Sequence, residues 1–263
     1  MSREDYPLGY GAGAQSWLLA RTHESQAGFF LPYLRPGMRL VDVACGPGVI
    51  SLGLAGIVAP GEVIGLDVER SQVEHATKAA EEKGVRNVRF EAADIYDIPF
   101  GDATFDAAFA GAILGHLRSP TAALREIRRV LKPGGTAGFR EFDHGGDIFY
   151  PVGPAIAESI ELYHRFMSAG GKHRDSGRRL KGWLNEAGLE VIEAGATYDV
   201  ADPARYAAQS VTLFKEQLAE QLKTKGHADD AKLARIYAAW EEMADNPDAF
   251  IAGAWVHAVA RRR

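Results

Sequence analysis

The segment Val41–Gly48 restricts the possible folds of this chain more than any other, because an apolar run ends there in a turn that contains proline and glycine. A second apolar run follows about 20 residues later and closes with Asp67. In α/β sheets, glycines after the first strand let the backbone approach a nucleoside, and a carboxylate after the second strand accepts hydrogen bonds from its ribose. The sequence therefore predicts a nucleoside pocket at the ends of two strands.

Composition and charge limit what else the chain can do. The 263 residues carry a net charge of −5, so nothing favours nucleic acid or an anionic membrane as a partner. A single cysteine excludes an intrachain disulfide and suits a reducing compartment. The first residues lack the layout of a signal peptide, and no run is apolar enough to span a membrane, so we expect a cytoplasmic protein. The terminal arginines, Arg261–Arg263, are expected to be solvated.

Strand and helix signals alternate through the first half of the sequence. The expected strands cover residues 40–44, 62–67, 88–92, 105–110 and 136–142, and the expected helices cover residues 48–58, 71–83 and 120–131. Ser71 and Glu74 have the spacing of a capping box, which predicts the start of the second helix. This alternation predicts an α/β fold in which helices cover both faces of a parallel sheet.

The last 110 or so residues are less regular. They are expected to hold helices over residues 155–168, 178–187, 203–223 and 228–244, and strands over residues 189–200 and 250–260. Because no linker or repeat is visible, we expect a single domain over residues 1–263. Its predicted parts are a helical N-terminal cap (1–36), a cofactor-binding core (37–142) and a substrate-side half (143–263) with a helical lid over 144–183 and 203–245.

The turn itself argues against a dinucleotide. A nicotinamide-binding turn has the pattern Gly-x-Gly-x-x-Gly, whereas this chain has Ser51 at the third glycine position and Pro47 between the first two. Four further features accompany the turn, and they are Asp42 in the first strand, Asp67, Asp94 after the third strand, and Lys132–Gly135 before the fifth.

Together these features closely resemble class I S-adenosylmethionine-dependent methyltransferases, and within them the branch similar to the ubiquinone and menaquinone C-methyltransferases. The resemblance is strong over residues 20–142 and rests on Val41–Gly48, Phe105-Asp106, Ala122–Gly135 and Arg140-Glu141. It implies a Rossmann-like, mostly parallel seven-stranded sheet with helical lid insertions. Ala44 departs from the family, which usually has glycine there, and its methyl group is expected to crowd the cofactor slightly.

The resemblance implies S-adenosylmethionine as cofactor and S-adenosylhomocysteine as product. The spacing of His164, His173, His227 and His257 does not suggest a metal site, so no metal is expected. Ala44, Gly46 and Gly48 should line the amino-acid part of the cofactor. Asp67 should bind the ribose and Asp94 the adenine amino group. The other implied contacts are Val68 and Ile95 at the adenine, Ala110 under the cofactor, Gln72 from the following helix, and Tyr10 and Arg21 at the methionine carboxylate. Asp67 and Asp94 could each instead be turn or helix-cap residues.

Catalytic residues are harder to identify, because a general base is needed only if the acceptor must lose a proton. The candidates after strands four and five are His116, Glu141 and His144, of which His116 could equally be a packing or cap residue. The aromatic residues of the predicted lid are Phe149, Tyr150, Tyr163, Phe166, Trp183, Tyr206, Phe214, Tyr237 and Trp240. Most of them are expected to be core. The others are expected to form an apolar, flat-walled pocket, which favours a small apolar or aromatic acceptor of quinone, polyketide or terpenoid type.

Two other functions stay open at this stage. A natural-product enzyme such as a pericyclase could bind S-adenosylmethionine without transferring its methyl group. A nicotinamide-dependent oxidoreductase could use the same fold, although Ser51 disfavours it. We expect a monomer or homodimer that acts on a small molecule.

Overall fold

The computed structural model describes residues 18–263, and a single eight-stranded sheet runs through it. The strands are β1 Leu40–Val43, β2 Val63–Asp67, β3 Val88–Ala92, β4 Phe105–Gly111, β5 Leu131–Phe142, β6 Ile148–Tyr150, β7 Leu189–Ala201 and β8 Phe250–Arg262. Their order is β3-β2-β1-β4-β5-β8-β6, and β7 pairs with the other edge of β8. Strands β1 to β5 are parallel, and β8 is antiparallel to each of its partners.

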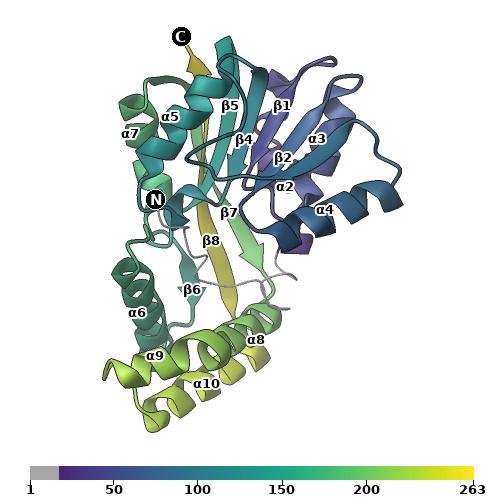
Figure 1. Ribbon diagram of the computed structural model, residues 1–263. Coiled ribbons are helices and arrows are strands. Elements are labelled where there is room, and N and C mark those ends of the chain that lie inside the picture. Colours follow the sequence, from purple (N-terminus) through teal and green to yellow (C-terminus); the bar gives the residue numbers. More distant parts are fainter. Residues whose placement is uncertain (1–17) are drawn as a thin grey trace.

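Helices cover both faces of this sheet, as predicted (Figure 1). On one face lie α2 His23–Ala27, α3 Val49–Val58 and α4 Arg70–Glu82, and on the other lie α5 Pro120–Val130 and α7 Ser176–Glu186. Short 3₁₀ turns occur at Leu31–Tyr33 (η1) and Leu114–His116 (η2). Phe30 and Phe109 are buried in the first layer, and Leu124 and Leu180 in the second. Apolar faces on both sides of parallel strands are what this architecture requires.

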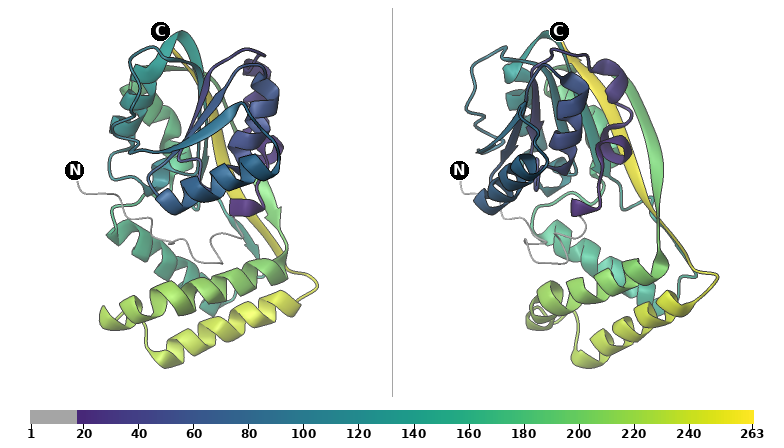
Figure 2. Two further views of the ribbon diagram at one scale, coloured as in Figure 1. Left: turned by 45° about the vertical axis from the view of Figure 1, so that its right-hand side comes forward. Right: turned by 90° about the vertical axis from the view of Figure 1, so that its right-hand side faces the viewer.

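A second group of helices packs beyond the end of the sheet (Figures 1 and 2). It consists of α6 Pro154–Ala169, α8 Pro203–Leu213, the π-helical turn η3 Phe214–Leu218, α9 Ala219–Thr224 and α10 Asp230–Asp245. These helices share a hydrophobic core of their own, which includes Phe214, Trp240 and, from β8, Ile251. We call this unit the lid. Within the described residues, no helix is long and apolar enough to cross a membrane.

Most aromatic residues of the lid belong to its hydrophobic core, as expected from the sequence. Phe214 and Trp240 are in the lid core, and five others pack against it: Phe149, Tyr163, Phe166, Tyr206 and Tyr237. Trp183 instead packs beside the sheet core, and Tyr150 is exposed. The aromatic side chains thus serve mainly to hold the lid together.

The sheet has one strand more than the seven predicted. Strand β8 is 13 residues long, and β5 pairs only with its section Trp255–Arg261. Beyond the section that pairs with β5, residues Phe250–Ala252 of β8 pair with the three-residue strand β6. Strand β6 lies within the segment that was predicted as part of the helical lid. A strand of three residues is too short to give a detectable alternation of apolar and polar residues.

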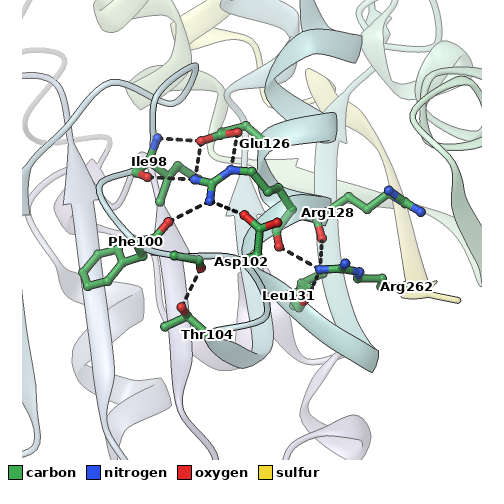
Figure 3. Close-up of polar contacts among 10 residues, drawn as sticks. Ile98, Phe100, Asp102, Thr104, Glu126, Arg128, Leu131 and Arg262 are labelled. Atoms are coloured by element: carbon green, nitrogen blue, oxygen red, sulfur yellow. Dashed lines mark hydrogen bonds and ion pairs between the residues drawn. The ribbon is translucent and has the colours of Figure 1, made fainter.

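The structure also corrects two local predictions. Helix α4 starts at Arg70 because the carboxylate of Glu69 accepts a hydrogen bond from the Ser71 amide, so Ser71 is not the cap. The terminal arginines are not all solvated, since Arg262 lies in β8 and donates to the carbonyl oxygens of Arg128, Arg129 and Leu131 (Figure 3). These carbonyls belong to the last turn of α5 and the residue after it, so Arg262 caps this helix end.

Arg129 also ties helix α5 to the loop between β3 and β4. The Arg129 guanidinium donates to Glu126 and Asp102, and to the carbonyls of Ile98 and Phe100 (Figure 3). The contact with Glu126 raises the pKa of Arg129 above its ordinary value. Through these contacts α5 holds the loop between β3 and β4, whose first residues line the cavity described next.

Candidate functional site

A cavity opens at the carboxyl ends of β1, β2, β3 and β4. It is lined by Leu18, Arg21, Val43, Ala44, Gly46, Leu66, Asp67, Val68, Ala93, Asp94, Ile95, Gly111, Ala112, Ile113, His116 and Leu117. The strands are parallel, so their carboxyl ends meet at one edge of the sheet. This edge is where α/β sheets place their ligands.

The turn after β1 brings backbone to the wall of the cavity. Gly46 has a φ of +52°, and a Cβ atom built on it would meet only a Leu18 methyl group, at 3.9 Å. The space beside Gly46 is therefore open to a ligand. Ala44 has a φ of +60°, where a residue with a Cβ is strained by about 1 to 2 kcal/mol. This strain explains why glycine is the more usual residue at this position.

Gly48 has a different role from the one predicted. A Cβ atom on Gly48 would lie 2.7 Å from Cβ of Ala76 and 2.8 Å from the Phe90 ring. Gly48 does not line the cavity. Its lack of a side chain lets α3 begin close to α4 and β3, so it is a packing glycine.

Asp67 closes β2 and faces the cavity with 8% of its surface exposed. Its Oδ2 accepts a hydrogen bond from the Gly46 amide at 2.9 Å, and its Oδ1 accepts one from the Glu69 amide at 2.9 Å. Burial raises the pKa of Asp67, and these two amide bonds oppose the rise. A carboxylate has lone pairs for about four hydrogen bonds, so Asp67 keeps capacity for a ligand while it fixes the glycine turn.

Asp42 and Ser51 form a buried pair behind this turn. The Ser51 hydroxyl donates to Oδ2 of Asp42 at 2.5 Å, and both side chains are excluded from water. Burial raises the pKa of Asp42 to about 7, with a further contribution from the charge of Asp67. Ser51, which stands where a dinucleotide turn has glycine, therefore ties α3 to β1. The hydrogen-bond partner of Asp42 is thus a side-chain hydroxyl from α3.

Asp94 supplies the second carboxylate at the cavity. Its Oδ1 accepts from the Tyr96 amide at 2.9 Å, which forms a turn after β3. Asp67 and Asp94 thus both have a turn role and both line the cavity. With the open backbone at Gly46 and the apolar side chains of Val68 and Ile95, they fit a nucleoside that carries a positive charge, as S-adenosylmethionine does.

The predicted cofactor residues fall into three groups. Seven line the cavity, and they are Arg21, Ala44, Gly46, Asp67, Val68, Asp94 and Ile95. Gly48, Gln72 and Ala110 do not. Gln72 is fully buried on the sheet-facing stripe of α4, and Ala110 points into the core because side chains alternate along β4. Tyr10 lies outside the described residues.

Several lining residues were missed from the sequence. After β4 the wall is formed by Gly111, Ala112 and Ile113, followed by Leu117. Ala112 has a φ of +56°, so the chain turns sharply there. The break in the apolar run at Gly111 is the signal that could have located them.

Glu141 positions this wall and does not face the cavity. It is fully buried, and its carboxylate accepts from the amides of Ile113, Leu114 and Gly115 at 2.8 to 3.1 Å. Burial raises the pKa of Glu141 and the three amides counteract the rise. The geometry therefore contradicts the prediction that Glu141 is catalytic, because its carboxylate is used to hold η2 in place.

His116, at the end of η2, lies at the cavity wall. Burial lowers the pKa of His116 to about 3, and the nearby charge of Lys172 contributes. The Lys172 ammonium donates to the His116 carbonyl at 2.5 Å and so fixes this residue from behind. His116 is therefore neutral near pH 7, which makes it a weak base there.

His144 lies one aromatic layer away from His116. The Phe142 ring lies between them, with ring centroids 5.2 Å from His116 and 4.7 Å from His144. Nδ1 of His144 is 2.8 Å from Oδ2 of Asp147, whose Oδ1 accepts from the Ala254 amide at 2.8 Å. Asp147 is thus held by β8 and in turn orients the imidazole of His144. His144 is not among the residues that line the cavity.

No cluster of three or more metal-ligating side chains occurs within residues 18–263. His164, for example, accepts a hydrogen bond at Nδ1 from Arg174 at 2.6 Å.

Comparisons with known proteins agree with this geometry. A family model described as a methyltransferase domain matches residues 34–188. An uncharacterized methyltransferase of Schizosaccharomyces pombe is 29% identical over 94% of each chain. A ubiquinone/menaquinone biosynthesis C-methyltransferase of Ectopseudomonas mendocina is 36% identical, and the match covers about half of each chain, 53% in both cases. Among solved structures, a [4+2]-cyclase superposes with a TM-score of 0.55 at 25% identity, covering 95% of this chain and 79% of that one.

Proposed function

Because the chain belongs to the methyltransferase domain family and is an S-adenosylmethionine-dependent enzyme, we propose that it methylates a small apolar or aromatic metabolite. The observation that carries this proposal is the pair of carboxylates, Asp67 and Asp94, at the ends of adjacent strands around an open glycine turn. Relatives named as O- and C-methyltransferases support a small-molecule acceptor.

In this proposal the described residues divide the cofactor between them. Asp67 accepts hydrogen bonds from the ribose hydroxyls, and Asp94 accepts from the adenine amino group. Val68 and Ile95 lie against the adenine ring, and Arg21 pairs with the methionine carboxylate. The bound cofactor supplies a methyl group on a cationic sulfur, which is already activated for displacement.

The protein then has to align the acceptor and exclude water. The apolar wall formed by Leu117, Ile113 and Gly111 removes water from one side of the cavity. His116 is neutral and can accept a hydrogen bond from an acceptor hydroxyl without competing for its proton. The acceptor would lie on the lid side of His116, where the Phe142 ring continues the wall.

We assign the base to His144 and a positioning role to Asp147. Asp147 contacts Nδ1 of His144, which leaves Nε2 as the atom that takes the proton from the acceptor. The Phe142 ring, stacked on the imidazole at an interplanar angle of 28°, fixes its plane. An imidazole oriented by a carboxylate is a recurrent arrangement for proton abstraction from a hydroxyl group.

Replacing His144 by glutamine is expected to lower kcat about a hundredfold or more, since a general base contributes on the order of 10²–10⁴. The affinity for S-adenosylhomocysteine should stay unchanged, because His144 does not line the cofactor cavity. Asp147→Asn should shift the pH–rate profile and lower kcat less. Steady-state kinetics over a pH series measures both effects. A His144→Gln variant with full kcat would show that no base acts at this position.

The test of the function itself is an acceptor screen with two readouts. Purified protein is incubated with S-adenosylmethionine and phenols, naphthols and polyketide enols, while S-adenosylhomocysteine release and product mass are followed. We expect equal amounts of S-adenosylhomocysteine and of a product heavier by one methyl group. No transfer with any acceptor class would remove support for the small-molecule proposal.

A second candidate function is cyclisation without methyl transfer, and the likeness to a [4+2]-cyclase favours it. In that case an acceptor with a diene and an alkene would be consumed with no change of mass and no S-adenosylhomocysteine. The same screen separates the two functions, because only methyl transfer changes the mass of the product.

A further inference from the structure

The large apolar side chains that remain in water are not scattered over the surface. Within residues 18–263 there are eight, and two of them, Leu19 and Val68, belong to the region of the cofactor cavity. The other six gather where the sheet extends beside the lid. They are Ile148, Tyr150, Val152, Tyr198, Val200 and Phe250. Single exposed hydrophobic residues are ordinary, but a cluster of this kind marks an interaction surface.

Strand register places five of these residues on one face of the sheet. Tyr150 pairs with Phe250, and Ile148 and Val200 pair with Ala252 from opposite sides. Tyr198 pairs with Ala254, two residues further along β8. Residues opposite each other or two apart point to the same face, so these side chains form one surface. We call it the β6–β8–β7 face, and Val152 continues it just beyond β6.

The opposite face of the same strands is already occupied. Phe149, Ile251 and Ala201 alternate with the residues named above and pack into the lid core. Figure 2 shows the lid helices packed beside the lower ends of the paired strands β7 and β8. The fold thus uses one side of this sheet extension for the lid and leaves its other side apolar and in contact with water.

The area of this surface is appropriate for an interface. Tyr150, Tyr198 and Phe250 are 59%, 53% and 43% exposed. Because an aromatic side chain buries about 150–250 Å² when covered, these three alone leave roughly 300 Å² uncovered. The aliphatic side chains extend it toward the upper end of the patches found on monomers, which is about 600 Å². A patch of that size supplies the apolar centre of a standard interface, which buries about 800 Å² on each partner.

The face presents apolar side chains from its two outer strands. Strand β6 carries Ile148 and Tyr150, and β7 carries Tyr198 and Val200. Ala252 of β8, which lies between them, is itself buried, so the exposed surface is made by the larger side chains of β6, β7 and Phe250. Under a two-fold axis, this surface of one copy packs on the same surface of the other.

We propose that the β6–β8–β7 face is the interface of a homodimer, in which a second copy of this chain packs face to face on it. This interface would lie behind the lid and away from the cofactor cavity. It would also cover the exposed apolar side chains of both copies at once, which an isologous contact does by symmetry.

Sedimentation velocity on the purified full-length chain tests the proposal. The wild-type protein should sediment as a dimer that dissociates on dilution. Val200→Lys places a charge within the contact and should raise the dimer dissociation constant about a hundredfold. Gln221→Lys adds the same charge on the exposed surface of α9 and should leave the dimer intact. Binding of S-adenosylhomocysteine to both variants shows that each has folded.

Three results would overturn the proposal. One is a wild-type chain that is monomeric at every concentration reached. Another is equal dimerisation of Val200→Lys and Gln221→Lys. The third is monomeric protein that cosediments with phosphatidylcholine vesicles, which would make a lipid surface the occupant of the face. If Val200→Lys does not fold, Tyr150→Lys at the edge of the same face replaces it, with the same expected loss of the dimer.

Discussion

Replacement of Asp67 by alanine is expected to weaken the binding of S-adenosylhomocysteine about a hundredfold or more. In the proposed complex the carboxylate accepts hydrogen bonds from both ribose hydroxyls. Hydrogen bonds to a charged group contribute about 1.5–3 kcal/mol each, and 1.4 kcal/mol corresponds to about a tenfold change in affinity. The variant also removes the acceptor for the Gly46 amide, so the glycine turn loses the bond that fixes it.

Isothermal titration calorimetry measures this effect directly. Asp67→Asn keeps one carbonyl oxygen as acceptor and should bind more weakly than wild type but more tightly than Asp67→Ala. Asp245→Ala removes the same charge from an exposed position at the end of α10 and should bind as wild type does. Unchanged binding by Asp67→Ala would mean that the cofactor lies elsewhere, and the assignment of the whole cavity would be lost.

The parts of this site that could be predicted from sequence are those fixed by local pattern. Asp67 and Asp94 each follow an apolar strand, and parallel strands bring their carboxyl ends together. Gly46 was identifiable because a turn between a strand and a helix needs a residue that tolerates positive φ. Neither inference requires knowledge of contacts between distant parts of the chain.

The wrong assignments depend on side-chain direction. Ala110 and Gly111 are neighbours, but the side chain of Ala110 is buried in the core, whereas Gly111 is the last residue of β4 and lines the cavity. A prediction that errs by one residue at the end of a strand therefore selects a core residue in place of a cavity residue. The assignment of Gln72 as a cofactor contact was wrong because the stripe of α4 on which it lies faces the sheet.

Other features could not be predicted because they join distant segments. The carboxylate of Glu141 binds amides that lie about 27 residues earlier in the chain, and no spacing rule links the two. Arg262 reaches α5 only because β8 returns antiparallel beside β5. The face formed by β6, β8 and β7 likewise exists only through strand register.

Replacement of Asp42 by asparagine is expected to stabilise the fold at alkaline pH far more than at acidic pH. An Asp carboxyl ordinarily titrates near 3.8, and burial raises the pKa of Asp42 to about 7 in the folded chain. Between these two values the folded chain keeps a proton that the unfolded chain has released. Stability from Asp42 is therefore fully present below about pH 3.8 and is lost as the pH rises to about 7, by an amount on the order of a few kcal/mol.

Asparagine has nearly the same shape, stays neutral throughout and can still accept the Ser51 hydroxyl through its carbonyl oxygen. Urea unfolding of both proteins at about pH 5 and about pH 8 measures the difference, with each free energy of unfolding extrapolated to water. The advantage of Asp42→Asn over wild type should grow between the two pH values by on the order of 2 kcal/mol. Contributions from other titrating groups cancel in this comparison, because they are common to both proteins.

Ser51→Ala provides the matched control. It removes the one hydrogen bond that lowers the pKa of Asp42, so the loss of stability with rising pH should persist and extend to higher pH than in wild type. An advantage of Asp42→Asn that is equal at both pH values would show that Asp42 does not titrate in this range. The charge behind the glycine turn would then be permanent, and Asp67 would have to bind the ribose beside a second buried carboxylate.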